Sequence, residues 1–125
     1  MSLHNHKSEK RRHPRIAKNL PIRIKDGDFD IVTETKNISC TGIYCQVDRY
    51  FPPFTKIKTK ILLPAKTKNK HQYIECDGIV VRIEKDGNDL EEQYNIAIYF
   101  NEISKTSVQK ISRFIKQRER VPSLI

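Results

Sequence analysis

Apolar and polar residues alternate along most of the chain between residues 20 and 100, as they do in β-strands that bury one face. Segment 56–63 is the clearest case, since lysines on one face alternate there with Ile57, Thr59, Ile61 and Leu63 on the other. The same period predicts strands over residues 20–25, 29–33, 43–47, 73–85 and 91–100, with a bend at Gly78. Turn residues separate the strands at 26–27, 51–54 and 86–89. About six short strands predict a small antiparallel barrel or a sandwich.

After residue 100 the apolar period becomes helical. One stripe of this predicted helix is apolar and contains Val108, Ile111, Phe114 and Ile115. Ser104 or Thr106 is expected to cap the first turn, and Thr106 with Gln109 has the spacing of a capping box. Pro122 prevents the helix from continuing. We expect the apolar stripe to pack on the strands or on a partner.

The length of 125 residues predicts one domain. We divide the chain into a flexible arm over residues 1–10, one domain over 11–118 that includes the helix, and a tail over 119–125. The longest apolar run has three residues, against about 20 for a membrane span, and the N-terminus lacks the apolar stretch of a secretory signal. Three cysteines argue against a disulfide framework. We therefore expect a cytoplasmic protein, monomeric or weakly dimeric.

Positive charge gathers at the N-terminus. The chain has 24 Lys and Arg against 15 Asp and Glu, a net charge of +9, and residues 1–25 hold eight of the cations against one Glu. This field favours anionic partners, which include nucleic acid, a phosphorylated small molecule and an anionic membrane face. A second block of lysines lies between residues 56 and 70, and we interpret it as a solvated surface.

Signatures of catalysis and metal binding are absent from the sequence. The chain has no phosphate-binding loop, no dinucleotide-binding glycine pattern and no nucleophile elbow. His4, His6 and His13 crowd the N-terminus, but no C-x-x-C pair accompanies them, so we expect no metal site. Cys40 and Cys45 are read as small apolar side chains. We predict a protein that is not an enzyme.

Two short patterns carry binding chemistry instead. The first is KRRHPR over residues 10–15, which places Arg11 and Arg15 four residues apart. Pro14 disfavours a helix here, so both guanidiniums project from an extended or turning segment. A guanidinium forms paired hydrogen bonds with phosphate or with the O6/N7 edge of guanine, and it stacks on flat rings.

The second pattern is NISCTG over residues 37–42, with the spacing [DN]-x-S-x-x-G just before an apolar strand. Asn37 and Ser39 are turn formers that present hydrogen-bonding groups from a loop. Gly42 permits either a positive φ or the close approach of a ligand to the backbone. The alternative interpretation is a plain Asx turn that leads into the strand.

In this order the two patterns resemble a known family, the PilZ domains. The run GIVVRI over residues 78–83 is similar to that family's later G-x-V-x-R strand, and residues 94–100 look like its final strand, after which a helix follows. The resemblance covers residues 9–118. It implies a mainly β fold, a six-stranded antiparallel barrel with a flexible N-terminal arm and a C-terminal helix, that binds the bacterial second messenger cyclic di-GMP without catalysis or cofactor.

The resemblance also implies which residues bind the ligand. Arg11 and Arg15 would hold guanine and phosphate groups, and Asn37, Ser39 and Gly42 would line the barrel face that receives a guanine. Lys10 and Arg12 are expected to add to the positive electrostatic field and to contact phosphate. The family's arm is thought to fold over the barrel when ligand binds, which would relay the signal to a protein partner.

Two positions depart from the family pattern. Position 37 is Asn where Asp is the other common choice, so one charge-assisted hydrogen bond is lost. Position 97 is Ala where the final strand often has Gly, which narrows the space beside a ligand. Two alternative functions stay open, a basic barrel that binds nucleic acid nonspecifically and a ligand-free adaptor of the same fold. Against binding of nucleic acid, the sequence has no evident group of aromatic residues on one sheet face on which bases could stack. We expect no sequence-specific nucleic acid partner.

Overall fold

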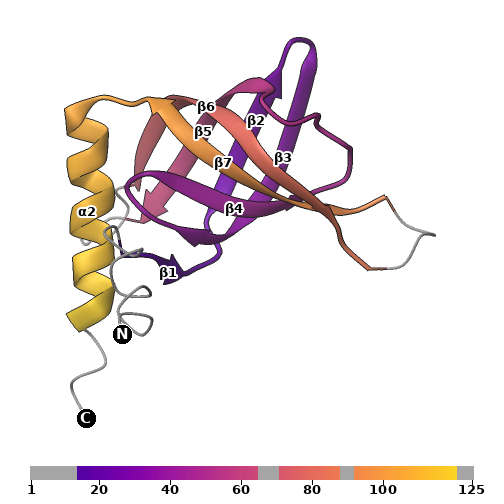
Figure 1. Cartoon of the computed structure of the whole chain (residues 1–125). Coiled ribbons are helices and arrows are strands. Elements are labelled where there is room, and N and C mark those ends of the chain that lie inside the picture. The colour runs from indigo at the N-terminus through magenta and orange to yellow at the C-terminus, as the bar shows by residue number, and fades with distance from the viewer. Residues whose placement is uncertain (1–13, 65–70, 88–91, 121–125) are drawn as a thin grey trace, which may run out of the picture.

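The computed structural model describes residues 14–64, 71–87 and 92–120 (Figure 1). Over these ranges the chain forms strands and one helix, which are β1 (Ile16–Ala17), β2 (Pro21–Asp26), β3 (Phe29–Ile38), β4 (Gly42–Val47), β5 (Lys56–Pro64), β6 (His71–Lys85), β7 (Tyr94–Glu102) and α2 (Lys105–Arg120). The expected arm over residues 1–10 lies outside the described residues.

The strands form one closed barrel. They pair antiparallel in the order β1-β3-β2-β5-β6-β7-β4, and β3 also pairs with β4, so the two edges of the sheet join. Six strands make the ring, while the two-residue β1 adds to the end of β3 (Figure 1). The six-stranded antiparallel barrel with a C-terminal helix is thus confirmed, and the sandwich is excluded.

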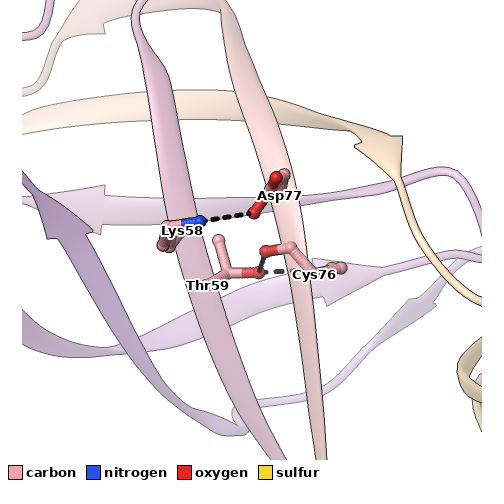
Figure 2. A network of polar contacts seen from close by, with 4 residues as sticks. All are labelled: Lys58, Thr59, Cys76 and Asp77. Carbon is pink, nitrogen blue, oxygen red and sulfur yellow. Dashed lines mark hydrogen bonds and ion pairs between the residues drawn. The ribbon is translucent and has the colours of Figure 1, made fainter.

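Alternate residues of each strand fill the barrel. All four residues of the predicted inner face of β5 are at most 3% exposed. Figure 2 shows both faces of the β5–β6 pair: the buried Thr59 hydroxyl donates to the Cys76 carbonyl oxygen at 3.1 Å, while the Lys58 ammonium meets the Asp77 carboxylate at 3.3 Å on the exposed side. Burial of the apolar face stabilises the barrel far more than such an exposed ion pair does.

Two strands differ in detail from the expectation. β7 begins at Tyr94 and continues to Glu102, two residues beyond the predicted end at 100, because Glu102 still pairs with Asp77 of β6. The predicted start at residue 91 lies outside the described residues. β6 is irregular at Gly78, as predicted, since its register with β7 shifts between Asp77 and Gly78. A second shift follows, at which Val81 is an extra residue.

Helix α2 packs its apolar stripe on the barrel. Ile111, Phe114 and Ile115 are at most 5% exposed within the same core as the strands. The helix begins at Lys105, one residue after Ser104, whose hydroxyl oxygen accepts a hydrogen bond from the Ser107 amide at 3.1 Å. Ser104 is therefore the cap, and the alternative cap at Thr106 with its capping box is wrong, because Thr106 already lies inside the first turn. This helix is neither long nor apolar enough to cross a membrane.

Replacing Ser104 by alanine is expected to lower the free energy of unfolding by about 1 kcal/mol, because the first turn loses its side-chain acceptor. The exposed Thr106 gives a matched control, since it caps nothing, and Thr106→Ala should change stability by less than about 0.5 kcal/mol. Urea unfolding followed by circular dichroism measures both variants. A larger effect at Thr106 than at Ser104 would overturn the assignment of the cap.

Candidate ligand-binding site

A pocket of about 140 Å³ opens on the outer wall of the barrel, beside the turn that joins β3 to β4. Strands β4 and β7 supply its floor, β6 supplies one rim, and the end of β3 with the entry to β1 supplies the other. The lining residues are Arg15, Asn37, Ser39, Thr41, Gly42, Ile43, Tyr44, Val81, Arg82, Ala97, Ile98 and Tyr99. An arginine stands at each end of the pocket, and polar, apolar and aromatic side chains lie between the two.

One cross-strand row organises the pocket. Asn37 of β3 pairs with Tyr44 of β4, Tyr44 with Ala97 of β7, and Ala97 with Arg82 of β6. Ala17 of β1 pairs with Asn37 and extends the row by one strand. Because neighbouring strands lie about 4.8 Å apart, residues distant in sequence meet on this wall.

Arg15 is positioned by the short strand that follows it. The segment between β1 and β2 is tied to buried Thr35, whose hydroxyl donates to the Lys18 carbonyl at 2.6 Å and accepts from the Leu20 amide at 3.0 Å. The Asn19 side-chain amide donates to the Thr35 carbonyl at 3.2 Å. These bonds hold β1 against β3, so the exposed Arg15 stands at the rim beside Asn37.

The turn of the second sequence pattern is built by Ser39. Its side chain is 3% exposed, and its hydroxyl oxygen accepts from the Thr41 amide at 3.2 Å. The Ser39 amide donates to the Gly42 carbonyl at 2.9 Å, which closes the turn. Ser39 therefore shapes the turn as well as lining the pocket. Below the turn, the Cys40 thiol lies 3.8 Å from the Val108 carbonyl of α2, so the turn contacts the helix.

Gly42 is required for a reason that neither sequence interpretation anticipated. Its φ is not positive, since the glycines with positive φ in the described part of the chain are Gly27 and Gly87. A Cβ at Gly42 would lie 2.2 Å from the Ile98 carbonyl oxygen of β7. The close approach that excludes a side chain is thus that of the neighbouring strand, and it brings β4 against β7 at the pocket floor.

The far rim is formed by β6 and Tyr44. The Arg82 guanidinium lies 6.0 Å from the centre of the Tyr44 ring, and the Tyr44 hydroxyl donates to the Glu84 carboxylate at 3.4 Å. Burial raises the pKa of Tyr44, and the nearby Glu84 carboxylate adds to the shift, so the phenol stays protonated as a donor. The residue at position 97 is half-buried between these side chains, and its methyl group occupies part of the floor.

The structure brings together four of the predicted ligand-binding residues, Arg15, Asn37, Ser39 and Gly42. Arg11, and with it Lys10 and Arg12, lies outside the described residues. Sequence reasoning placed Ala97 beside the ligand but missed seven residues of the lining, which are Thr41, Ile43, Tyr44, Val81, Arg82, Ile98 and Tyr99. The signal for Arg82 was present in the G-x-V-x-R strand, but its place beside Tyr44 depends on the barrel register.

Thiols and carboxylates form no metal site within residues 14–64, 71–87 and 92–120. Cys45 and Cys76 are buried in the core, and Cys40 is half-buried. Burial raises the pKa of the Cys45 thiol to about 12, against an ordinary value of 9.0. Cys45 therefore behaves as the small apolar residue that the sequence predicts.

This pKa shift gives a prediction for stability at alkaline pH. Between about pH 9 and 12 the Cys45 thiol ionises in the unfolded chain but stays protonated in the folded chain, so the free energy of unfolding falls as the pH rises through this range. Cys45→Ala should be less stable at pH 7 but should lose less stability between pH 8 and 10.5. Urea unfolding at a series of pH values tests this. Equal losses in both proteins would contradict it.

The sequence as a whole matches one family model. The PilZ domain model covers residues 9–117, which is most of the chain. The chain belongs to the PilZ domain family. A comparison with curated proteins found no match. The family assignment agrees with the resemblance noted in the two sequence patterns and with the closed barrel.

Solved structures share the PilZ fold. The Bacillus subtilis inhibitor of motility MotI/DgrA matches with a TM-score of 0.75 and 22% identity, over 87% of this chain and 51% of that one. The PilZ domain of YcgR from Escherichia coli, solved with c-di-GMP, matches with a TM-score of 0.62 and 16% identity, over 89% and 92%. MrkH, described as a c-di-GMP-dependent transcription regulatory factor, gives 0.67 and 16%, over 87% and 51%. This chain thus spans about half the length of MotI/DgrA and MrkH.

Proposed function

We propose that the protein is a non-catalytic receptor for cyclic di-GMP. The observation that carries the proposal is the pocket on the outer wall, where Arg15 meets Asn37, Ser39 and Gly42 although the two sequence patterns lie some twenty residues apart. Membership of the PilZ family and the fold shared with the c-di-GMP-bound PilZ domain of YcgR support the same ligand.

The chemistry of the pocket fits this ligand. Cyclic di-GMP presents two phosphodiesters and two guanines. The exposed guanidinium of Arg15 is suited to a phosphate oxygen or to the O6/N7 edge of guanine. The Asn37 amide oxygen can accept from guanine N–H groups. Tyr99, with half of its surface exposed beside the pocket, offers a flat face for a base.

We further propose that Arg11 joins Arg15 on the ligand and that the N-terminal arm rearranges when ligand binds. The support is sequence spacing, because Arg11 precedes the rim residue by four positions. Arm rearrangement would alter the surface that a protein partner meets, and the signal would be relayed through that partner.

Nonspecific binding of nucleic acid is the second candidate, favoured by the net charge of +9. On the opposite wall, across β2 and β5, arginine and lysine side chains line a groove of about 440 Å³. Carboxylates accompany these cations: Arg23 lies 3.3 Å from Asp30, and Lys60 lies 3.8 Å from Glu75. Because the acids offset much of the local field, this wall suits a polyanion poorly, and cyclic di-GMP remains the favoured ligand. A ligand-free adaptor is the third candidate, and the intact Arg15 pocket argues against it.

Isothermal titration of the whole chain at physiological salt tests the three candidates. Cyclic di-GMP is the ligand, and GTP and single-stranded DNA are the controls. Saturable binding of cyclic di-GMP alone, with a Kd in the micromolar range or tighter (a binding free energy of about −8 kcal/mol), is the expected result. Binding of DNA alone that fades steeply with salt would favour the nucleic acid candidate. No binding of any of the three would favour the adaptor.

A further inference from the structure

A second arginine stands at the opposite end of the pocket from Arg15. Arg82 of β6 lies in the same cross-strand row as Asn37, with β4 and β7 between them. The two rims are formed by β1 and β6, and β3, β4 and β7 lie between them in the row. Neighbouring strands of a sheet are about 4.8 Å apart. Both arginines line one pocket, and a ligand with two phosphates and two bases offers a separate acceptor group to each of them.

Arg82 is held by neighbours that lie on the pocket side of the wall. Its Nε atom is 3.9 Å from the Glu84 carboxylate, and its guanidinium faces the Tyr44 ring. Glu84 in turn accepts a hydrogen bond from the Tyr44 hydroxyl. Tyr44 and Glu84 come from β4 and β6, so this contact crosses β7. The small side chain of Ala97, which pairs with Tyr44 on one side and Arg82 on the other, lies between them.

We propose that Arg82 is a second anion-binding residue of the cyclic di-GMP site and that Glu84 competes with the ligand for it. This inference rests on the proposed function and extends it to the far half of the ligand. Arg15 anchors one half at the β1 rim, and Arg82 donates to a phosphate or to the O6/N7 edge of the guanine at the β6 rim.

Arg82 is available for this role because its present partner holds it weakly. The Arg82 and Glu84 side chains are 61% and 54% exposed, and their closest N–O distance is 3.9 Å. Water screens such a pair, and its loss costs little. A phosphodiester or guanine edge offers the guanidinium two parallel hydrogen bonds in place of this single long contact.

Glu84 opposes binding in two ways. Its carboxylate repels an anionic ligand, and it contacts both Arg82 and the Tyr44 hydroxyl, which a ligand would have to draw away from it. Removing the charge while keeping the shape should therefore strengthen binding. A residue with a purely structural role would not show a gain of affinity on such a change.

Titration with cyclic di-GMP at physiological salt tests the inference on four variants. Arg82→Ala should weaken binding about tenfold through the loss of charged hydrogen bonds, and Glu84→Gln should strengthen it about two- to fivefold. Arg23→Ala and Glu75→Gln are matched controls, because both residues form exposed ion pairs on the opposite wall. Neither control should change the Kd by more than about twofold. Circular dichroism and urea unfolding verify that each variant is folded.

The outcomes separate this inference from the proposed function. If the unaltered chain binds and Arg15→Ala weakens binding while Arg82→Ala and Glu84→Gln do not change it, the second arginine is overturned and the receptor stands. If Arg82→Ala fails to fold, Glu84→Gln alone decides, and unchanged or weaker binding by that variant overturns the competition. Absence of binding by the unaltered chain overturns both proposals.

Discussion

Arg15→Ala is expected to weaken the binding of cyclic di-GMP by about thirtyfold. A charged hydrogen bond in a bound complex contributes about 1.5–3 kcal/mol, which corresponds to roughly 10- to 150-fold in Kd. Arg15 is the arginine of the first sequence pattern that the structure describes, and it stands at the rim beside Asn37. Because its side chain is exposed, the substitution should leave the free energy of unfolding nearly unchanged.

Arg23→Ala serves as the control for this measurement. Arg23 is an exposed arginine of β2 on the opposite wall, so the same loss of one positive charge occurs away from the pocket. If both variants lost affinity equally, general charge attraction would explain binding and the pocket would not. If Arg15→Ala bound as tightly as the unaltered chain, the assignment of Arg15 to the site would be wrong.

Gly42→Ala is expected to destabilise the fold by about 3 kcal/mol or more. The added Cβ would lie 2.2 Å from the Ile98 carbonyl oxygen, a backbone atom that cannot move without disturbing the β4–β7 pairing. Forcing atoms into a packed region costs about 1–3 kcal/mol, and occasionally more, in displaced side chains and backbone. Urea unfolding measures this loss of stability. The loss should be the same whether or not the chain also carries a substitution at a ligand-binding residue.

Gly27→Asn is the control for the glycine substitution. Gly27 occupies the β2–β3 turn with a φ of 62°, and a Cβ there would meet no atom within 4 Å. Asn tolerates this left-handed conformation, so the cost should stay below about 1 kcal/mol. A Gly42→Ala protein as stable as the Gly27→Asn protein would show that β4 and β7 are not as tightly apposed as described.

The barrel was predictable because its interior imposes a period of two. Each strand that buries one face must alternate, and the inward residues of β5 do so without interruption. The helix was predictable for the same reason at a period of 3.6 residues. Its cap was not decided by sequence, because Ser104 and Thr106 have the same chemistry and only the position of the first turn separates them.

The residues of the site that lie in the two sequence patterns could be predicted from the sequence, whereas the position of Arg82 could not. Arg15, Asn37, Ser39 and Gly42 sit in local patterns whose chemistry can be read from the residues. The position of Arg82 depends on a register shift that makes Val81 an extra residue of β6, and a slip of one residue would turn Arg82 to the other face. The alternation of apolar and polar residues in the sequence does not reveal such a shift in strand register.

β1 was also beyond sequence reasoning. Two residues carry no period, and the strand exists because buried Thr35 bonds to the segment that follows it, at sequence separations of 15 and 17 residues. The reason for Gly42 was hidden likewise, since the atom it avoids belongs to Ile98, far along the chain. Long-range contacts of this kind decide where the pocket residues meet.

Titration of the ¹⁵N-labelled chain with cyclic di-GMP, followed through its backbone amide resonances, tests directly whether the ligand binds in the pocket on the outer wall. We expect saturable shifts of the amides in the pocket row, at Asn37, Tyr44, Ala97 and Arg82, and of those in the turn, at Ser39 and Gly42. Amides on the opposite wall, at Lys58 and Glu75, should stay in place. Saturable shifts confined to that opposite wall, or no shifts at all, would show that this pocket does not bind cyclic di-GMP.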